Sequence, residues 1–497
     1  MFSQLPEEIF QLILALISKN DTIRLARVSR PLHTRLAPTF YTAINTTCFC
    51  VGVHRGLVHT LLLHPELARC ARQLRLGHIP WCAENSHYSG HRHEHYECPE
   101  SNAKLRAVVR RLCRRDWELT QWLEDLELGA HRDPWLAILL YLVPDLESLE
   151  IFWGGTGTRY SEWVLKRGLQ SRAPFDQSPI LPNLHTATIK VLSHEGRDFH
   201  LPRIAPFFQM PSMRTFRGNL MTDRLREYAM LPPNSSPITT LDLRQCGADT
   251  GFVDLIAPCA NLQSFTYTEM THNYHPGDYT ELFFLGLHPS PMMKALASKR
   301  ETVETLKISC SRRDRFRRQG VYANDWFGPL SPFDRLKHVH VDAANFDGTG
   351  ESMREEDDEP LMPLIEFLPA SIVSLWIADA NSARDDPRPL WGLVVRELEA
   401  LVRVAPDRFP GLNRIDVEAR DLLRGAEKDV EAWEEVYPDY LGLLHDSVAV
   451  QTESLRAACI DRGIEFRVRD GRVEAHFEDV DDPFRLGRDD DDSDDEH

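Results

Sequence analysis

The chain has 497 residues, of which 42% are hydrophobic and 27% are charged, and its formal net charge is −18. This composition is typical of a globular protein with a large core, and it excludes collagen-like and wholly disordered chains. The acidic balance argues against a general binder of nucleic acid or of anionic membranes, because such binding needs clustered positive charge.

Residues 6–36 carry the pattern of three short helices. Pro6 stands where the first helix should begin, and Glu7 and Glu8 occupy its first turn, where the positive end of the helix dipole favours them. Asn20 is suited to end this helix and Asp21 to cap the second one. The apolar positions of the first helix form one stripe, which consists of Ile9, Leu12, Ile13, Leu16 and Ile17.

The second and third helices continue this pattern. Ser29 is suited to cap the third helix, with Pro31 in its first turn and Leu32 and Leu36 pointing inward. Three helices of this length cannot bury both apolar stripes among themselves, so we expect part of the apolar surface to meet a partner. The stripe of the second helix consists of Ile23, Leu25 and Val28.

These residues resemble an F-box. The motif runs without a gap through Leu5-Pro6-Glu7-Glu8-Ile9-Phe10, Ile13, Leu16, Asn20-Asp21 and Leu25-Ala26-Arg27-Val28-Ser29-Arg30. The resemblance implies binding to the Skp-family adaptor of a cullin-RING ubiquitin ligase, through Leu5, Pro6, Ile9, Leu25, Val28 and Ser29. Two positions depart from the family pattern, because Leu32 stands where many members have a larger aromatic residue and Pro31 is unusual. An ordinary helical cap on a larger domain is the alternative.

Residues 46–145 are expected to form a connecting segment with a weak strand at Leu74–Leu76 and a helical insertion within 103–143. Histidine and cysteine gather at Cys82, His87, His91, His93, His95 and Cys98, and both are common zinc ligands. No C-x₂-C pair occurs there, and the histidines alternate with Arg92 and Glu94. A surface loop is therefore the preferred interpretation over a metal site, and Cys48 and Cys50 fit a strand edge better than a redox pair.

From residue 146 onward a short motif of the form apolar-x-x-apolar-x-apolar repeats, and each copy reads as a short strand. The clear copies are Leu146-Leu149-Ile151, Leu184-Ala187-Ile189, Ile238-Leu241-Leu243, Leu262-Phe265-Tyr267, Val303-Leu306-Ile308, Leu336-Val339-Val341, Ile372-Leu375-Ile377 and Leu412-Ile415-Val417. Weaker copies lie at Met213-Phe216 and Phe466-Val468. Helical stretches separate them, including 254–256, 292–297 and 390–404.

The spacing from Phe216 to Leu241 to Phe265 is 25 and then 24 residues, within the range of about 20–29 for leucine-rich repeats. Each strand-plus-helix unit has an apolar face that only a neighbouring unit can bury, which predicts a solenoid. The pattern resembles the divergent leucine-rich repeats that follow the F-box in many fungal proteins. The predicted fold class is therefore α/β: a three-helix F-box at 1–45, then an irregular repeat array at 146–470 with parallel strands and outer helices. A plain α/β domain is the alternative.

The residue between the second and third apolar positions of each motif should point away from the core, to the concave side of the array. Most of these residues are polar, and the row reads Glu150, Thr188, Asp242, Thr266, Lys307, His340, Trp376 and Asp416. An exposed Trp buries much area at little entropic cost, so Trp376 is a candidate contact for a protein target, with Lys307 and His340 beside it. The alternative is that a loop covers Trp376 and makes it structural.

No residues are assigned to catalysis, to a cofactor or to a metal. Gly154-Gly155-Thr156-Gly157 lacks the ending of a phosphate loop and fits a repeat turn, and no nucleophile stands beside a base in a known motif. The arginines of 312–318 suit a site for acidic or phosphorylated segments, a nuclear-import signal or a solvated loop. We therefore expect a protein that is not an enzyme.

The end of the chain is strongly acidic. Residues 478–497 hold eleven acidic residues and two arginines, which is half of the net charge, and we expect 471–497 to be disordered. Ser493 resembles a site for an acidophilic kinase, and a solubilising tail is the alternative. The longest apolar run, 135–143, has nine residues and a membrane-spanning helix needs about 20, so none is expected. Scattered cysteines favour reduced thiols in the cytosol or nucleus.

These observations predict a substrate-recognition subunit of an SCF-type ubiquitin ligase. The F-box would bind the adaptor, the repeats would bind a protein target, and the chain itself would do no chemistry. The alternative is a repeat scaffold whose F-box binds the adaptor outside any ligase.

Overall fold

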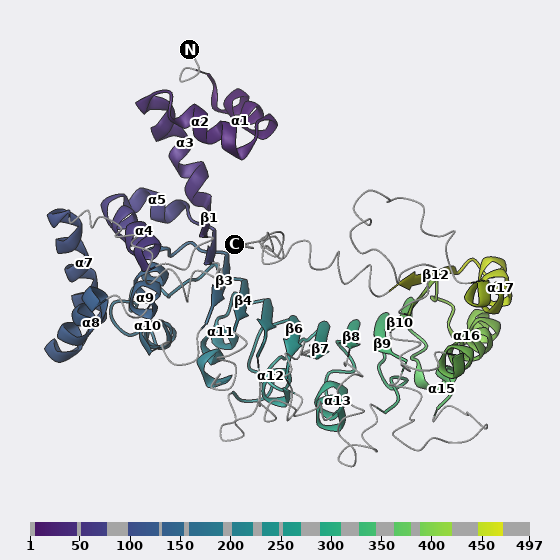
Figure 1. Cartoon of the computed structure of the whole chain (residues 1–497). Coiled ribbons are helices and arrows are strands. Elements are labelled where there is room, and N and C mark those ends of the chain that lie inside the picture. The colour runs from purple at the N-terminus through teal and green to yellow at the C-terminus, as the bar shows by residue number, and fades with distance from the viewer. Residues whose placement is uncertain are drawn as a thin grey trace, which may run out of the picture. The chain divides into compact units, whose positions relative to one another are not determined.

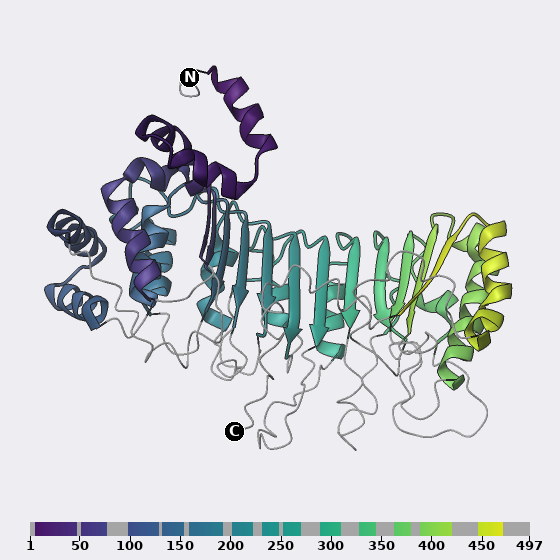
Figure 2. The same cartoon turned by 45° about the horizontal axis from the view of Figure 1, so that its top comes forward.

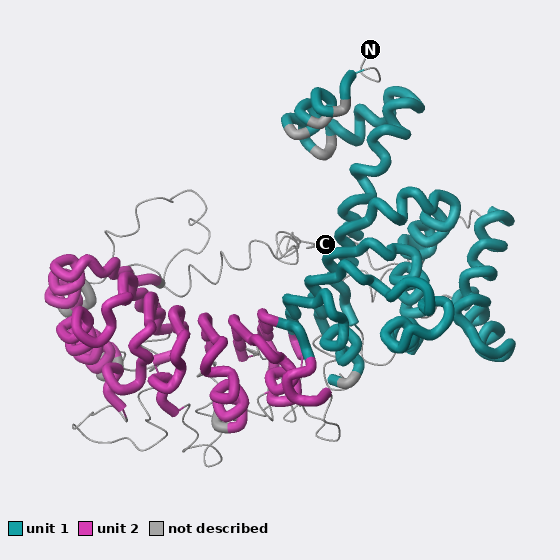
Figure 3. Tube along the Cα trace, turned by 180° about the vertical axis from the view of Figure 1, so that it is seen from behind, with its two compact units in different colours: residues 1–219, 236–238 teal, residues 220–235, 239–497 magenta. Residues whose placement is uncertain are grey.

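The computed structural model describes residues 5–46, 51–76, 98–128, 132–153, 159–191, 201–221, 231–247, 252–269, 289–309, 328–343, 362–378, 388–419 and 446–470 (Figure 1). The chain divides into two compact units (Figure 3). Unit 1 comprises residues 1–219 and 236–238, and unit 2 comprises residues 220–235 and 239–497. Each unit is described below by itself.

Unit 1 begins with three helices, α1 (Glu7–Leu16), α2 (Lys19–Ala26) and α3 (Arg30–Thr42). They share a small core of Phe10, Ala26, Leu32 and Leu36, against which Leu5, Leu14, Leu25 and Phe40 pack. The predicted cap at Ser29 is confirmed, because its hydroxyl accepts a hydrogen bond from the Leu32 N–H at 3.4 Å. The predicted cap at Asp21 is wrong: Ser18 caps α2 by accepting from the Asp21 N–H at 3.1 Å, which places Asn20 and Asp21 inside the helix.

The rest of unit 1 is a parallel sheet with helices. Its strands pair in chain order: β1 (Ala43–Thr46), β2 (Gln73–Leu76), β3 (Ser148–Phe152), β4 (Thr186–Lys190) and β5 (Thr215–Asn219). Its further helices are α4 (Val51–Leu63), α5 (Pro65–Cys70), α7 (Pro99–Leu112), α8 (Asp116–Leu128), α9 (Asp133–Leu142), α10 (Arg159–Leu169), the 3₁₀ helix η3 (Leu201–Arg203) and α11 (Ala205–Gln209). The predicted strands and the helical insertion are confirmed, whereas β1 and the helices α4, α5, α8, α10, η3 and α11 were not predicted.

Unit 2 continues the same alternation. Its strands are β6 (Thr240–Cys246), β7 (Ser264–Glu269), β8 (Thr305–Ser309), β9 (His338–Asp342), β10 (Ser374–Ala378), β11 (Arg414–Ala419) and β12 (Glu465–Asp470), all parallel and paired in chain order. Its helices are α12 (Val253–Ile256), α13 (Pro289–Ala297), α15 (Leu364–Phe367), α16 (Arg388–Arg408) and α17 (Asp446–Asp461). In Figure 2 the strands of each unit lie side by side in chain order.

The repeated motif explains this arrangement. In unit 2 its apolar positions are buried, as for Leu306, Ile308, Leu375 and Ile377, and Figure 1 shows α12, α13, α15 and α16 along one side of the strands. Main-chain hydrogen bonds also link successive repeats just before their strands, as where the Lys337 N–H donates to the Glu304 carbonyl at 2.9 Å. The predicted parallel α/β repeat array is therefore confirmed. No helix in the described parts of the chain is long and apolar enough to cross a membrane.

Candidate functional site

The N-terminal helices of unit 1 carry the first candidate surface. Of the large apolar side chains, Ile9, Leu12, Leu16 and Val28 are exposed by 46%, 63%, 87% and 71%. Pro6 is exposed as well. The core of the three helices cannot take these side chains, because it is already filled by Phe10, Ala26, Leu32 and Leu36. Their exposure agrees with the expectation that the three helices cannot bury all of their apolar positions among themselves.

The six predicted adaptor contacts divide into two groups. Pro6, Ile9 and Val28 are exposed, whereas Leu5 and Leu25 are partly buried against the core of the helices. Ser29 is occupied as the cap of α3. Leu12 and Leu16 were recognised as part of the apolar stripe but were not among the predicted contacts. The spacing of the stripe was the signal that could have added them.

Arg35 fixes the start of α1 onto α3. Its guanidinium donates a hydrogen bond to the Leu5 carbonyl at 2.9 Å and lies 3.9 Å from the centre of the Phe10 ring. These contacts join the first described residue of the motif to a buried aromatic residue one turn later. They hold Pro6 and Ile9 in place, so the exposed apolar face belongs to an ordered helix rather than to a loose end.

The second candidate surface is a row of side chains across the strands of unit 2. The strand register places Thr266, Lys307, His340, Trp376, Asp416 and Arg467 opposite one another on β7 to β12. The three predicted target-binding residues, Lys307, His340 and Trp376, are therefore neighbours, as the motif spacing implied. All three are partly buried, between the fully buried apolar positions of their strands.

Trp376 is held by its neighbours in this row. The His340 ring stacks on the Trp376 ring with centroids 4.7 Å apart and planes 9° apart. The Arg469 guanidinium lies 4.5 Å from the Trp376 ring centre, and the indole N–H donates to Glu418 Oε2 at 3.3 Å. These contacts fix the orientation of the ring without covering it completely, so Trp376 remains a candidate contact and is also a structural part of the row.

Asp416 corrects the expectation that the row is uniformly exposed. Its side chain is only 3% exposed, because Arg414 and Arg469 lie on either side of it. Arg414 Nε donates to Asp416 Oδ2 at 2.6 Å, and Arg469 Nε donates to Asp416 Oδ1 at 2.8 Å. A short carboxylate between two long guanidinium side chains is covered by them. Asp416 therefore supports the arginines and is not itself presented to a partner.

The row carries its positive charge on Lys and Arg rather than on His. Burial, together with the charges of Lys307 and Arg469, lowers the pKa of His340 to about 3. The imidazole is therefore neutral at neutral pH and acts as a flat ring that packs on one face of Trp376. The resulting surface combines a stacked aromatic pair with Lys307 and Arg469 at its sides, a composition that is common where proteins bind proteins.

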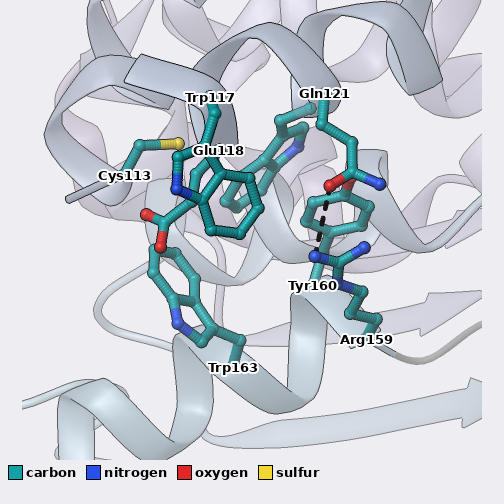
Figure 4. Close-up of a pocket in the computed structure, with 8 residues that line it drawn as sticks. Cys113, Trp117, Glu118, Gln121, Arg159, Tyr160 and Trp163 are labelled. Atoms are coloured by element: carbon teal, nitrogen blue, oxygen red, sulfur yellow. Dashed lines mark hydrogen bonds between the residues drawn. The ribbon is translucent and has the colours of Figure 1, made fainter. Parts of the chain in front are cut away.

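A pocket in unit 1 was not predicted from the sequence. It lies between α8 and α10, has a volume of about 110 Å³, and is shown in Figure 4. Its lining consists of Cys113, Trp117, Glu118, Gln121, Trp122, Arg159, Tyr160 and Trp163. These residues come from segments about forty positions apart, and no repeat or motif joins them. The only signal in the sequence was the density of aromatic residues in two short stretches.

Several predicted features lie outside the described residues. These are the histidines and Cys82 of the zinc candidate, Cys48 and Cys50, the glycines of 154–157, the arginines of 312–318, and Ser493. Cys98 is described, and it is a partly buried free thiol just before α7. Within the described ranges no group of three or more His, Cys, Asp or Glu side chains is arranged to hold a metal ion.

Comparison with known proteins identifies the repeats. A family model described as a leucine-rich repeat domain matches residues 46–437, which is well over half of the chain. Among curated proteins, none matches this chain. The matched range begins after the three N-terminal helices, so the resemblance of residues 5–30 to an F-box stays a prediction.

Proposed function

The chain belongs to the leucine-rich repeat family, and we propose that it is a substrate-recognition subunit of an SCF-type ubiquitin ligase. The leucine-rich repeat domain itself indicates a protein–protein interaction role. The finer proposal assigns one partner to each candidate surface. The N-terminal helices bind a Skp-family adaptor, and the repeats bind a protein target, in the cytosol or the nucleus.

The exposed apolar face of the N-terminal helices carries this proposal. Four large apolar side chains face solvent: three on α1 and one in the turn after α2, namely Ile9, Leu12, Leu16 and Val28. Burial of one such side chain at a partner contributes roughly 1.5–3 kcal/mol. Exposure of these four apolar side chains to water does not stabilise the three helices, whose core is small. A dedicated protein partner explains it, and the F-box resemblance of the same residues names the partner.

The row of unit 2 is the proposed target site. The stacked rings of His340 and Trp376 supply apolar area at low entropic cost, and Lys307 supplies a charge beside them. The chain would contribute no catalytic group of its own. Its contribution would be to hold the target near the charged ubiquitin-carrying enzyme, which converts an encounter in solution into a reaction between neighbours.

Adaptor binding provides the direct test. The double variant Ile9→Ala, Val28→Ala removes exposed apolar groups that are not part of the small core of the three helices. It should therefore fold normally and lose binding to a purified Skp-family adaptor. The matched control is Val450→Ala, Ile460→Ala, which removes the same two residue types from exposed positions on α17, at 70% and 71% exposure. Adaptor binding that is equal in the two double variants would contradict the F-box proposal.

A second experiment separates the ligase from the scaffold. Partners that purify with the wild-type chain should become ubiquitinated in a mixture that contains adaptor, cullin and the ubiquitin-transfer enzymes. The reaction should fail when the cullin is omitted and when the Ile9→Ala, Val28→Ala chain is used. A chain that binds the adaptor but gives no ubiquitination in the complete mixture would instead act as a scaffold outside a ligase.

A further inference from the structure

The pocket between α8 and α10 is lined by aromatic rings that are tilted relative to one another. The Trp122 and Tyr160 rings have centroids 4.5 Å apart with planes 38° apart, and the Trp122 and Trp163 rings are 5.7 Å apart with planes 72° apart. Trp117 completes the lining and is 53% exposed, so it stands at the mouth. Ring faces carry partial negative charge, and walls at several angles present such faces to a single enclosed group.

Two walls of the pocket already have electrostatic partners. The Arg167 guanidinium lies 4.6 Å from the centre of the Trp163 ring, so this indole binds a cation within the chain. The Tyr160 hydroxyl donates a hydrogen bond to Asp125 Oδ2. Donation to a carboxylate increases the electron density of the phenol ring and occupies its polar hydrogen. Tyr160 therefore presents an electron-rich ring to the pocket rather than a hydrogen-bond donor.

Glu118 places a carboxylate among these rings. Its Oε2 accepts hydrogen bonds from the main-chain N–H groups of Arg114 and Arg115, at 2.7 and 3.3 Å, which fix the side chain in position. Figure 4 shows the carboxylate between Trp117 and Trp163. Arg159 lies on the opposite side of the pocket, where its guanidinium donates to Gln121 Oε1 at 3.2 Å. The Glu118 side of the pocket is thus the side suited to a cation.

The size of the pocket limits its occupant to one small group. A cavity of about 150 Å³ in another protein holds a benzene molecule, so the pocket here, at about 110 Å³, suits a group slightly smaller than benzene. Cys113 also lines it, but burial raises the pKa of this thiol to about 11, so it is protonated and not a nucleophile at neutral pH. The lining is therefore built for binding rather than for covalent chemistry.

An ammonium group that carries methyl groups fits these walls better than an unmodified one. The unmodified lysine ammonium is compact and strongly hydrated, and it needs hydrogen-bond acceptors that ring faces do not replace. Methylation enlarges the group, removes its N–H donors and leaves its charge in place. Such cations are the ligands that aromatic cages recognise.

We propose that the pocket formed by Trp117, Trp122, Tyr160 and Trp163, with Glu118 at its side, binds the methylated ammonium group of a modified lysine on a partner protein. This site lies on α8 and α10, apart from the N-terminal helices, and it does not depend on the ligase proposal. It gives the repeat protein a means to select a partner by its modification state, in addition to its sequence.

The test is a calorimetric titration of the full chain with Nα-acetyl-Nε-trimethyllysine amide. Two comparison compounds have the same length: the unmethylated lysine, and an analogue with a neutral tert-butyl group in place of trimethylammonium. We expect saturable binding of the trimethylated compound, and binding at least tenfold weaker for both comparison compounds. Equal binding of the tert-butyl analogue would show an apolar pocket and overturn the proposal, as would tighter binding of free choline or no binding at all.

Variants then assign the binding to this pocket. Trp117→Ala should reduce the affinity at least tenfold, while Leu128→Ala, an exposed apolar position on the same helix, should leave it unchanged. Glu118→Gln should weaken binding severalfold. Arg159→Gln should strengthen it, because the exposed guanidinium repels a cation. Glu118→Gln keeps the shape of the side chain and Arg159 is exposed, so both variants should fold. Weaker binding by Arg159→Gln together with no effect of Glu118→Gln would mean that the pocket prefers an anion, and would overturn the proposal.

Discussion

Gly168 provides a quantitative test of the packing that positions the pocket. It lies in α10, the helix that carries Tyr160 and Trp163, and it is buried against Ile180. A Cβ atom at this position would lie 2.1 Å from Ile180 Cγ2 and 2.4 Å from Ile180 Cβ. Ile180 is 6% exposed and cannot swing into solvent. Glycine is therefore needed at position 168 for the close approach of α10 to Ile180.

The expected effect of Gly168→Ala is the balance of two terms. Alanine in place of glycine within a helix stabilises by roughly 0.5–1 kcal/mol. Overpacking of a filled core costs about 1–3 kcal/mol, and a contact with Ile180 Cβ, next to the backbone, favours the upper end of that range. The variant should therefore lose about 2 kcal/mol of unfolding free energy. Urea denaturation followed by circular dichroism would measure this loss as a lower midpoint.

The matched control is Gly56→Ala in α4, which belongs to the same unit. A Cβ at Gly56 meets nothing within 4 Å, so only the helix term remains and the variant should gain about 0.5–1 kcal/mol. Ile180→Ala should cost less in the Gly168→Ala background than in the wild-type chain, because it removes the Cγ2 atom that meets the new Cβ. If Gly168→Ala stabilises the chain as Gly56→Ala does, the packing of α10 on Ile180 is wrong, and so is the pocket wall it supports.

Three further predictions concern the row of unit 2. Trp376→Ala should lower the unfolding free energy by about 1–2.5 kcal/mol, because the ring stack and the Arg469 contact contribute roughly 0.5–1.5 and 0.5–1 kcal/mol, and it should abolish target capture. Leu375→Ala, at the buried neighbour, should cost roughly 2–5 kcal/mol, and a loss of equal size in both variants would make Trp376 a core residue. Asp416→Ala removes the buried carboxylate shared by Arg414 and Arg469 and should cost about 3 kcal/mol of unfolding free energy. Glu465→Ala, which removes the half-exposed partner of Arg467, should cost less than about 1 kcal/mol, and equal thermal shifts would refute this assignment. Finally, His340 takes up a proton near its ordinary pKa of 6.5 in the unfolded chain but only near a pKa of about 3 in the folded chain, so the unfolding free energy should fall as the pH decreases through this window. His340→Phe should reduce the slope of unfolding free energy against pH, measured by urea titration between pH 7.5 and 5. An unchanged slope would contradict a neutral His340 ring.

The repeats could be predicted from the sequence because their information is local. Each motif places one buried residue before and one after a residue that faces away from the core. Parallel pairing brings the equivalent residues of neighbouring strands opposite one another. Lys307, His340 and Trp376 were placed side by side on this basis, and the register confirms it. Strand β1 was missed because Ile44 and Thr46 are its only buried positions and no motif precedes them.

The alternation of apolar and polar residues does not show whether an outward-facing side chain is exposed or is covered by its neighbours. Asp416 and Trp376 occupy the same position in successive repeats, yet the first is buried and the second is partly open. The difference comes from Arg414 and Arg469, which lie two and fifty-three residues away from Asp416 in the sequence. Side-chain length and charge decide such contacts after the backbone is placed, so the exposed row could be predicted as a set but not residue by residue.

The pocket could not be predicted from the sequence either, because its aromatic lining residues come from two helices that no motif joins. Residues in the repeats must serve the register, since each strand buries its neighbours and a changed residue affects two interfaces. The outer faces of helices α8 and α10 are not constrained by this strand register. Asp133, at the start of α9, joins α10 to α9 by accepting hydrogen bonds from the Tyr160 and Ser161 N–H groups, and Gly168 lets α10 pack closely on Ile180. These contacts fix α10 in position. Tyr160 and Trp163 of α10 therefore form one side of the pocket, and Trp117 and Trp122 of α8 form the other.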